Sequence, residues 1–124
     1  PNITPDNKTG IGLWSDDDFV RAVTQGVRRD GEHLFPAMPY TDYTKVTRDD
    51  VLAIRAYLAT LPAVSNGVTA DQLSFPLSVR ANMAAWNKLY FTPGEFRRDP
   101  DKSEAWNRGA YLPLPGAGCD RSAQ

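Results

Sequence analysis

Few side chains in this sequence of 124 residues could bind a metal or carry out covalent chemistry. His33 is the only histidine and Cys119 the only cysteine. A lone cysteine excludes an intrachain disulfide and a zinc site built from several thiolates. The sequence also contains few residues that could form a catalytic pair of nucleophile and histidine base. The acidic run 16–18 stands in the first turn of an expected helix, where the helix dipole favours negative charge. An enzyme active site is therefore not expected.

Another candidate, Met38, lies in an apolar run, residues 34–40, that proline interrupts twice. Pro36 and Pro39 forbid a regular helix there and disfavour a central strand. The run must bury its side chains against a flat apolar ligand or against neighbouring helices. By its type alone, Met38 is explained as filling a gap in the core, as methionine commonly does.

Helix signals stand on both sides of this run. Ser15, with Asp18 three residues later, has the spacing of a capping box and predicts a helix over 16–25, which Gly26 ends. Thr47 and Asp50 repeat that spacing before a second helix with a broad apolar stripe.

Proline and polar residues divide the second half of the chain. Pro62 ends the second helix, and a small, polar linker follows. Further helices are expected over about 77–89, where Met83 and Trp86 are interpreted as packing residues, and over 104–112. Strand signals are weak, so the predicted fold class is mainly α with long ordered loops.

Composition excludes two classes of partner. The 14 basic and 15 acidic residues give a formal net charge of -1, which argues against a nucleic-acid-binding protein. No run approaches the roughly 18 apolar residues of a membrane span.

Long, ordered motifs run through the chain to about Leu112. They include Asn2-Ile3-Thr4-Pro5-Asp6, Thr9-Gly10-Ile11-Gly12, Trp14-Ser15-Asp16, Leu34-Phe35-Pro36-Ala37-Met38-Pro39-Tyr40, Ala56-Tyr57-Leu58, Leu61-Pro62, Met83-Ala84-Ala85-Trp86-Asn87 and Trp106-Asn107-Arg108-Gly109-Ala110-Tyr111-Leu112. In these runs the chain closely resembles the cytochrome c subunits of membrane-associated bacterial alcohol, aldehyde and gluconate dehydrogenases. These are periplasmic proteins with several cytochrome c domains joined by linkers.

The resemblance implies a domain plan with cytochrome c-like helices. Residues 1–62 would form the later part of one cytochrome c-like domain, with its axial-methionine loop. Residues 63–102 would form an interdomain linker with one helix. Residues 103–124 would begin a following cytochrome c-like domain that diverges at its end.

The resemblance also assigns a site, in which Met38 takes the place of the axial methionine of haem c. A thioether is a soft iron ligand that raises the reduction potential, and the flanking prolines, Pro39 among them, stiffen its loop. Trp14, Tyr40 and Tyr43 would line the haem crevice, although ordinary aromatic core explains them as well. His33 is expected to be a surface or loop residue, because it lies too close to Met38 along the chain to reach the opposite haem face.

The haem-attachment motif of the family, Cys-x-x-Cys-His, is absent from this sequence. Cys119 stands near the expected place of a second such motif, but Ser122 and Ala123 follow where a cysteine and a histidine would fall. Covalent haem c would therefore need residues from outside these 124.

Two hypotheses of function follow. The first is a fragment of an electron-carrier subunit, not itself catalytic, that passes electrons from a periplasmic dehydrogenase to the respiratory chain. Its partners would be the catalytic dehydrogenase subunit and, through other subunits, quinone or a terminal oxidase. It would lie at the outer face of the bacterial inner membrane and associate with that membrane only through the complex. The second is a haemless interaction or docking domain derived from such a subunit.

Overall fold

The computed structural model describes residues 2–35, 38–67 and 80–112. Within these ranges the elements are α1 (Asp16–Gln25), α2 (Tyr40–Tyr43), α3 (Arg48–Ala59), α4 (Arg80–Tyr90) and α5 (Glu104–Tyr111). The described residues form no strand and only one isolated antiparallel bridge, between Val27 and His33. The predicted class, mainly α with long loops, is confirmed.

The predicted bounds of α1 are correct because its caps are encoded locally. The Ser15 side chain accepts a hydrogen bond from the Asp18 amide, and the Asp18 carboxylate accepts one from the Ser15 amide. Hydrogen bonds from Ser15 hold the pKa of the Asp18 carboxyl below its usual range. At the other end Gly26 adopts the left-handed conformation, with φ 66°. Such a residue closes a helix most cheaply when it lacks a Cβ.

The capping box predicted for α3 is completed differently. The Thr47 hydroxyl accepts from the Asp50 amide, as expected. The Thr47 amide, however, donates to the Tyr111 hydroxyl at 3.1 Å, and this hydroxyl donates to the Asp50 carboxylate. A tyrosine of α5 therefore supplies the bond that Asp50 was predicted to make.

The broad apolar stripe predicted for α3 is only partly buried. α1 packs against both α2 and α3, and the shared core holds Phe19, Ala22, Tyr40 and Val51. Val51 is the only residue of α3 that is fully buried, whereas Ile54 and Tyr57 are exposed.

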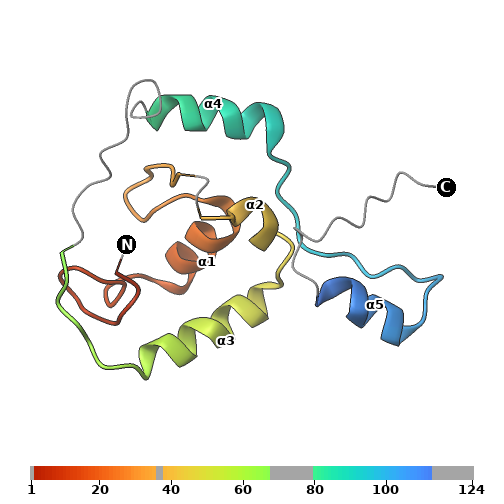
Figure 1. The fold of residues 1–124 in the computed structure, drawn as a ribbon, viewed down its shortest axis with the longest axis horizontal. Helices are drawn as coiled ribbons and strands as arrows, with labels where there is room; N and C mark the ends of the chain where they lie inside the picture. Colours follow the sequence, from red (N-terminus) through yellow and green to blue (C-terminus); the bar gives the residue numbers. More distant parts are fainter. Residues whose placement is uncertain (1, 36–37, 68–79, 113–124) are drawn as a thin grey trace.

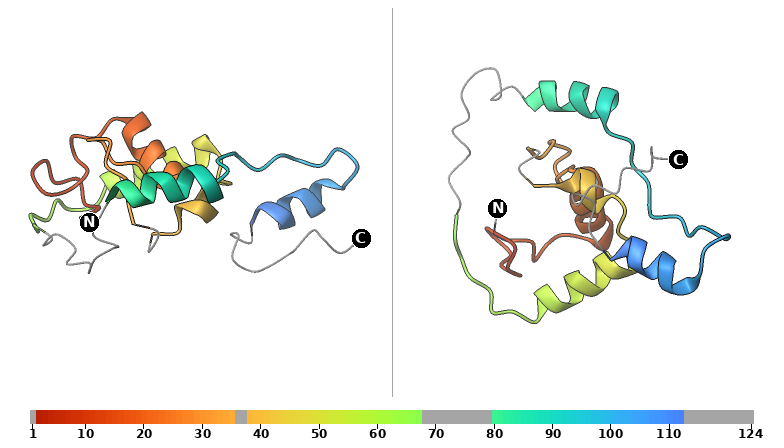
Figure 2. Two further views of the ribbon diagram at one scale, coloured as in Figure 1. Left: turned by 90° about the horizontal axis from the view of Figure 1, so that it is seen from above. Right: turned by 45° about the vertical axis from the view of Figure 1, so that its right-hand side comes forward.

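Of the part of the chain predicted to be a linker, the structure describes residues 63–67 and 80–102, and both stretches lie at the outside of the first three helices (Figure 1). Before α4, the Val64 carbonyl accepts from the Asn2 side chain at 2.7 Å and from the Thr4 hydroxyl at 3.2 Å. After α4, the Phe96 amide donates to the Lys45 carbonyl at 3.0 Å. α5 stands at the margin of the molecule, near the start of α3 (Figure 2).

α4 and α5 agree with their predicted positions, although residues 77–79 of the predicted third helix lie outside the described ranges. The single-turn helix α2 was not predicted, because residues 26–46 had been interpreted as one loop. None of the helices in the described ranges is long and apolar enough to cross a membrane.

Candidate haem-ligand site

Met38 is held in a short turn that leads into α2. Its amide donates to the Phe35 carbonyl at 3.1 Å, and its carbonyl accepts from the Tyr40 amide at 2.8 Å. Its side chain is half-buried. The backbone on both sides of the thioether is therefore fixed by hydrogen bonds, which is what a preplaced ligand needs.

Tyr40 is fully buried, with 0% of its surface exposed. Its ring lies over Gly26, where a Cβ would come within 2.6–2.7 Å of three ring atoms. The edge of this ring also meets Phe91 at a centroid distance of 5.4 Å and an interplanar angle of 89°. Its hydroxyl donates to Asn87 Oδ1 at 2.6 Å. The tyrosine predicted to line the haem crevice is thus packed between the end of α1 and the linker helix α4.

The other predicted site residues lie in two places. Pro39 is the exposed N-cap of α2, and its carbonyl accepts from the Tyr43 amide at 3.1 Å, so both residues belong to the turn that follows Met38. Trp14 precedes α1, and its carbonyl accepts from Arg55 of α3. It lines a shallow depression of about 310 Å³ with residues 28–30. The structure therefore groups Met38, Pro39, Tyr40 and Tyr43 on one segment and places Trp14 on another.

Asn87 joins this site, although no role was expected for it from the sequence. Only 7% of it is exposed. While its Oδ1 accepts from Tyr40, its Nδ2 lies 3.2 Å from His33 Nδ1. His33 was expected to be a surface or loop residue; it lies in a loop and is half-buried. The available signal was that Asn87 follows buried Met83 by four residues, which puts an amide on the apolar face of a helix.

The residues present fit one side of a haem site. Met38 offers a single soft sulfur donor of the kind that c-type haem iron accepts. In the described ranges no group of three or more His, Cys, Asp or Glu side chains could hold a metal ion. Cys119, Pro36 and residues 113–124 lie outside those ranges. Met38 is thus the residue whose chemistry suits an axial ligand, and the sequence contains no Cys-x-x-Cys-His motif for covalent attachment.

Burial raises the pKa of the Tyr40 hydroxyl above the ordinary tyrosine value. The folded protein therefore holds this proton more tightly than the unfolded chain, and the stabilisation is complete below about pH 10 and is lost at higher pH. We expect Tyr40→Phe to flatten the alkaline decline of the unfolding free energy above pH 10. Urea unfolding at a series of pH values from about 8 to about 11.5 measures this decline in the unfolding free energy. Tyr57→Phe, at an exposed tyrosine, is the control and should keep the wild-type slope.

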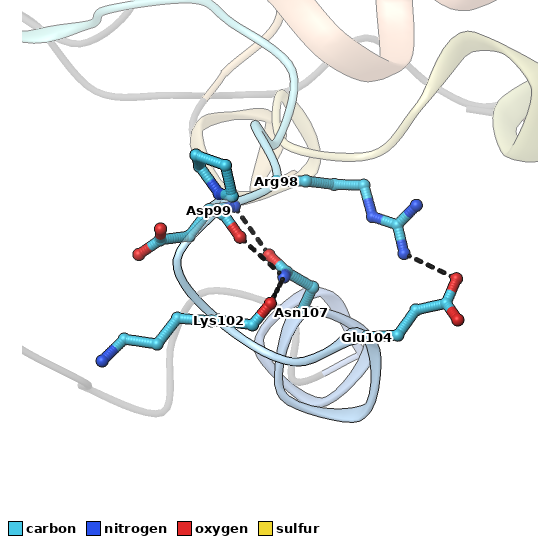
Figure 3. Close-up of a pocket in the computed structure, with 6 residues that line it drawn as sticks. Arg98, Asp99, Lys102, Glu104 and Asn107 are labelled. Carbon is cyan, nitrogen blue, oxygen red and sulfur yellow. Dashed lines mark hydrogen bonds and ion pairs between the residues drawn. The ribbon is translucent and has the colours of Figure 1, made fainter.

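The junction between the linker and α5 is a second polar cluster (Figure 3). Asn107 is buried, and its Oδ1 accepts from the Asp99 amide at 2.7 Å. Its Nδ2 lies 2.9–3.2 Å from the carbonyls of Asp99, Lys102 and Ser103. Both polar atoms of the Asn107 side chain thus have hydrogen-bond partners within this turn. The cluster is therefore interpreted as stabilising the turn and not as binding a ligand.

The chain is similar in sequence to several known proteins. No family model matches the chain. About 90% of the chain aligns with a nicotinate dehydrogenase subunit of Pseudomonas putida at 47% identity, and 90% aligns with the fructose dehydrogenase cytochrome subunit of Gluconobacter japonicus at 38%. The same share aligns with the gluconate 2-dehydrogenase cytochrome c subunit of Pantoea cypripedii at 39%. The chain spans 9%, 23% and 26% of the lengths of these three relatives. Over nine-tenths of its length this chain is thus homologous to a segment of the cytochrome c subunits of bacterial dehydrogenases, as its motifs predicted.

Proposed function

We propose that this chain provides the methionine side of a haem c pocket in an electron-transfer subunit. The observation that carries the proposal is the position of Met38, in a hydrogen-bonded turn within a segment homologous to cytochrome c subunits. A haem bound there supplies one-electron chemistry, because its iron cycles between two oxidation states.

The side chains around Met38 have supporting roles in this proposal. Met38 would hold the haem iron through its sulfur, and Pro39 restricts the backbone beside it. Tyr43 and Tyr40 belong to the adjoining turn, and Trp14 adds an aromatic side chain before α1. Their apolar surface would exclude water from the pocket and so favour a raised potential. Covalent attachment would need a Cys-x-x-Cys-His motif, which these 124 residues do not contain.

The domain plan extends this proposal. Residues 1–62 form the later part of one cytochrome c-like domain, residues 63–102 the linker, and residues 103–124 the start of the next domain. The contacts of Val64 and Phe96 with the first part support a linker that is docked on that domain.

The names of the relatives support a proposal for the partner and the location. Two of these relatives are named as cytochrome subunits of a fructose dehydrogenase and of a gluconate dehydrogenase. For this chain we infer a catalytic dehydrogenase subunit as electron donor and quinone or a terminal oxidase as the eventual acceptor. The site of action is the periplasmic face of the inner membrane, with the complex providing the membrane contact.

Replacement of the proposed ligand gives the direct test. In the protein expressed from its native gene, we expect Met38→Leu to abolish the methionine–iron charge-transfer band of one haem. The same change should lower the potential of that haem by about 0.1 V or more, within the roughly 0.8 V range that axial ligands span. Visible spectroscopy and a redox titration measure the two effects.

Met83→Leu is the matched control for this replacement. Met83 is buried on α4, and exchange for leucine of similar volume costs little. It should leave the band and the potential unchanged. A c-type spectrum that is the same in Met38→Leu and in the wild type would refute the ligand assignment.

A haemless docking domain is the second candidate, and one observation favours it. Tyr40 is completely covered by other residues of this chain, among them Gly26, Asn87 and Phe91. A folded native protein without any haem absorbance would support this function and exclude the electron carrier.

A further inference from the structure

The loop that carries Met38 has two ends that are anchored in different ways. At its start, the Leu34 amide donates to the Gly26 carbonyl at 2.7 Å, next to the bridge between Val27 and His33. At its end, Tyr40 begins α2 and is fully buried. His33 and Tyr40 therefore stand at the two ends of the segment that carries Met38.

One side chain from a distant part of the sequence contacts both ends. Asn87 accepts a hydrogen bond from the Tyr40 hydroxyl at 2.6 Å and lies 3.2 Å from His33 Nδ1. These partners are 47 and 54 residues away along the chain. Since Oδ1 accepts from Tyr40, Nδ2 is the donor toward His33 Nδ1, whose ring then carries its proton on Nε2.

The surroundings of Asn87 make this contact rigid. Met83, one helical turn before it, is buried, and Phe91, one turn after it, meets the Tyr40 ring edge-on. The Phe91 amide donates to the Asn87 carbonyl at 2.9 Å, which fixes the end of the helix. The amide is 7% exposed, so water competes little for its hydrogen bonds.

We propose that Asn87 is a positioning residue for the Met38 ligand: from the linker helix it holds both ends of the methionine loop at once. The inference rests on the proposed function, because it assumes that the Met38 sulfur binds iron. It goes beyond that function by giving the linker helix a part in ligand geometry. When α4 is docked, the Met38 loop is held in place. Any displacement of α4 would release the two ends of this loop.

The test compares variants of the protein expressed from its native gene. Asn87→Leu keeps the branching of the side chain at Cγ and removes both hydrogen bonds. Imidazole competes with the methionine sulfur for the iron and can be titrated at the methionine–iron charge-transfer band. We expect Asn87→Leu to raise the affinity of that haem for imidazole about tenfold, the effect of losing roughly one hydrogen bond's net free energy. Lys88→Gln, at an exposed neighbour on α4, is the control and should match the wild type.

Two further measurements keep the outcomes distinct. Hydrogen exchange at the amides of Leu34, Met38 and Tyr40 should accelerate in Asn87→Leu and not in Lys88→Gln. If Asn87→Leu does not fold, Tyr40→Phe removes one of the two bonds and should give a smaller rise in imidazole affinity. Wild-type imidazole affinity and exchange in Asn87→Leu would overturn the positioning role. A wild-type spectrum without the methionine–iron band would instead refute the proposed function, and the ligand-positioning role with it, whatever the exchange shows.

Discussion

Replacement of Gly26 by alanine is expected to lower the unfolding free energy of the chain by about 2–6 kcal/mol. The first reason is the backbone, because φ at Gly26 is 66° and a side chain there costs of order 1–3 kcal/mol. The second is the Tyr40 ring, which three close contacts at 2.6–2.7 Å place where the new Cβ would lie. Tyr40 is fully buried and cannot retreat, so overpacking adds about 1–3 kcal/mol. Urea unfolding followed by far-ultraviolet circular dichroism measures the sum.

Gly31→Ala separates the two causes. Gly31 also has a positive φ, 84°, but no atom lies within 4 Å of the place that a Cβ would take there. This variant should show only the backbone cost, so that Gly26→Ala is destabilised more. Equal losses in the two variants would mean that the Tyr40 ring does not lie against Gly26.

The helices could be predicted because their ends are encoded by neighbouring residues. Ser15 and Gly26 define α1 within one turn of the residues they cap, and Ser103 does the same for the start of α5. Such signals need no knowledge of the tertiary structure. α2 carries no such signal, because four residues are too few to show a helical period.

Contacts between distant segments were beyond the reach of sequence patterns. The Thr47 and Asp50 spacing predicted the start of α3 correctly, yet the hydroxyl that completes the cap comes from Tyr111, 64 residues after Thr47. Nothing in the local sequence of α3 indicates that partner. The spacing identifies the cap, and only the fold identifies all of its partners.

The residues of the candidate site also fall into two groups: those that the local sequence indicates and those whose contacts depend on the fold. The motif around Met38 is enough to single it out as the proposed ligand, because the residue type and its neighbours are local properties. Tyr40 was predicted to be an aromatic residue of the same site, but its burial depends on Gly26 and on α4. Asn87 carries no motif of its own, and its importance becomes visible only when α4 is docked.

Asn107→Leu is expected to open the junction between the linker and α5. Leucine has the same branching at Cγ but leaves the Asp99 amide and the carbonyls around it without the side-chain amide shown in Figure 3. An unsatisfied buried group costs about 1–3 kcal/mol, so we expect a local loss of roughly 2 kcal/mol. The Asp99 amide should then exchange its hydrogen roughly 30-fold faster, measured by NMR or mass spectrometry.

The matched control is Glu104→Gln, one turn away from Asn107 on the same helix. Glu104 pairs with Arg98 at 3.1 Å, but both side chains are mostly exposed, so loss of this ion pair should change stability by less than about 0.5 kcal/mol. Exchange at Asp99 should therefore stay at the wild-type rate. If Glu104→Gln accelerates exchange as much as Asn107→Leu, surface charge and not the buried amide holds α5 at the end of the linker. Tyr111 also ties α5 to Thr47, so an opening confined to residues 99–103 is the specific signature of Asn107.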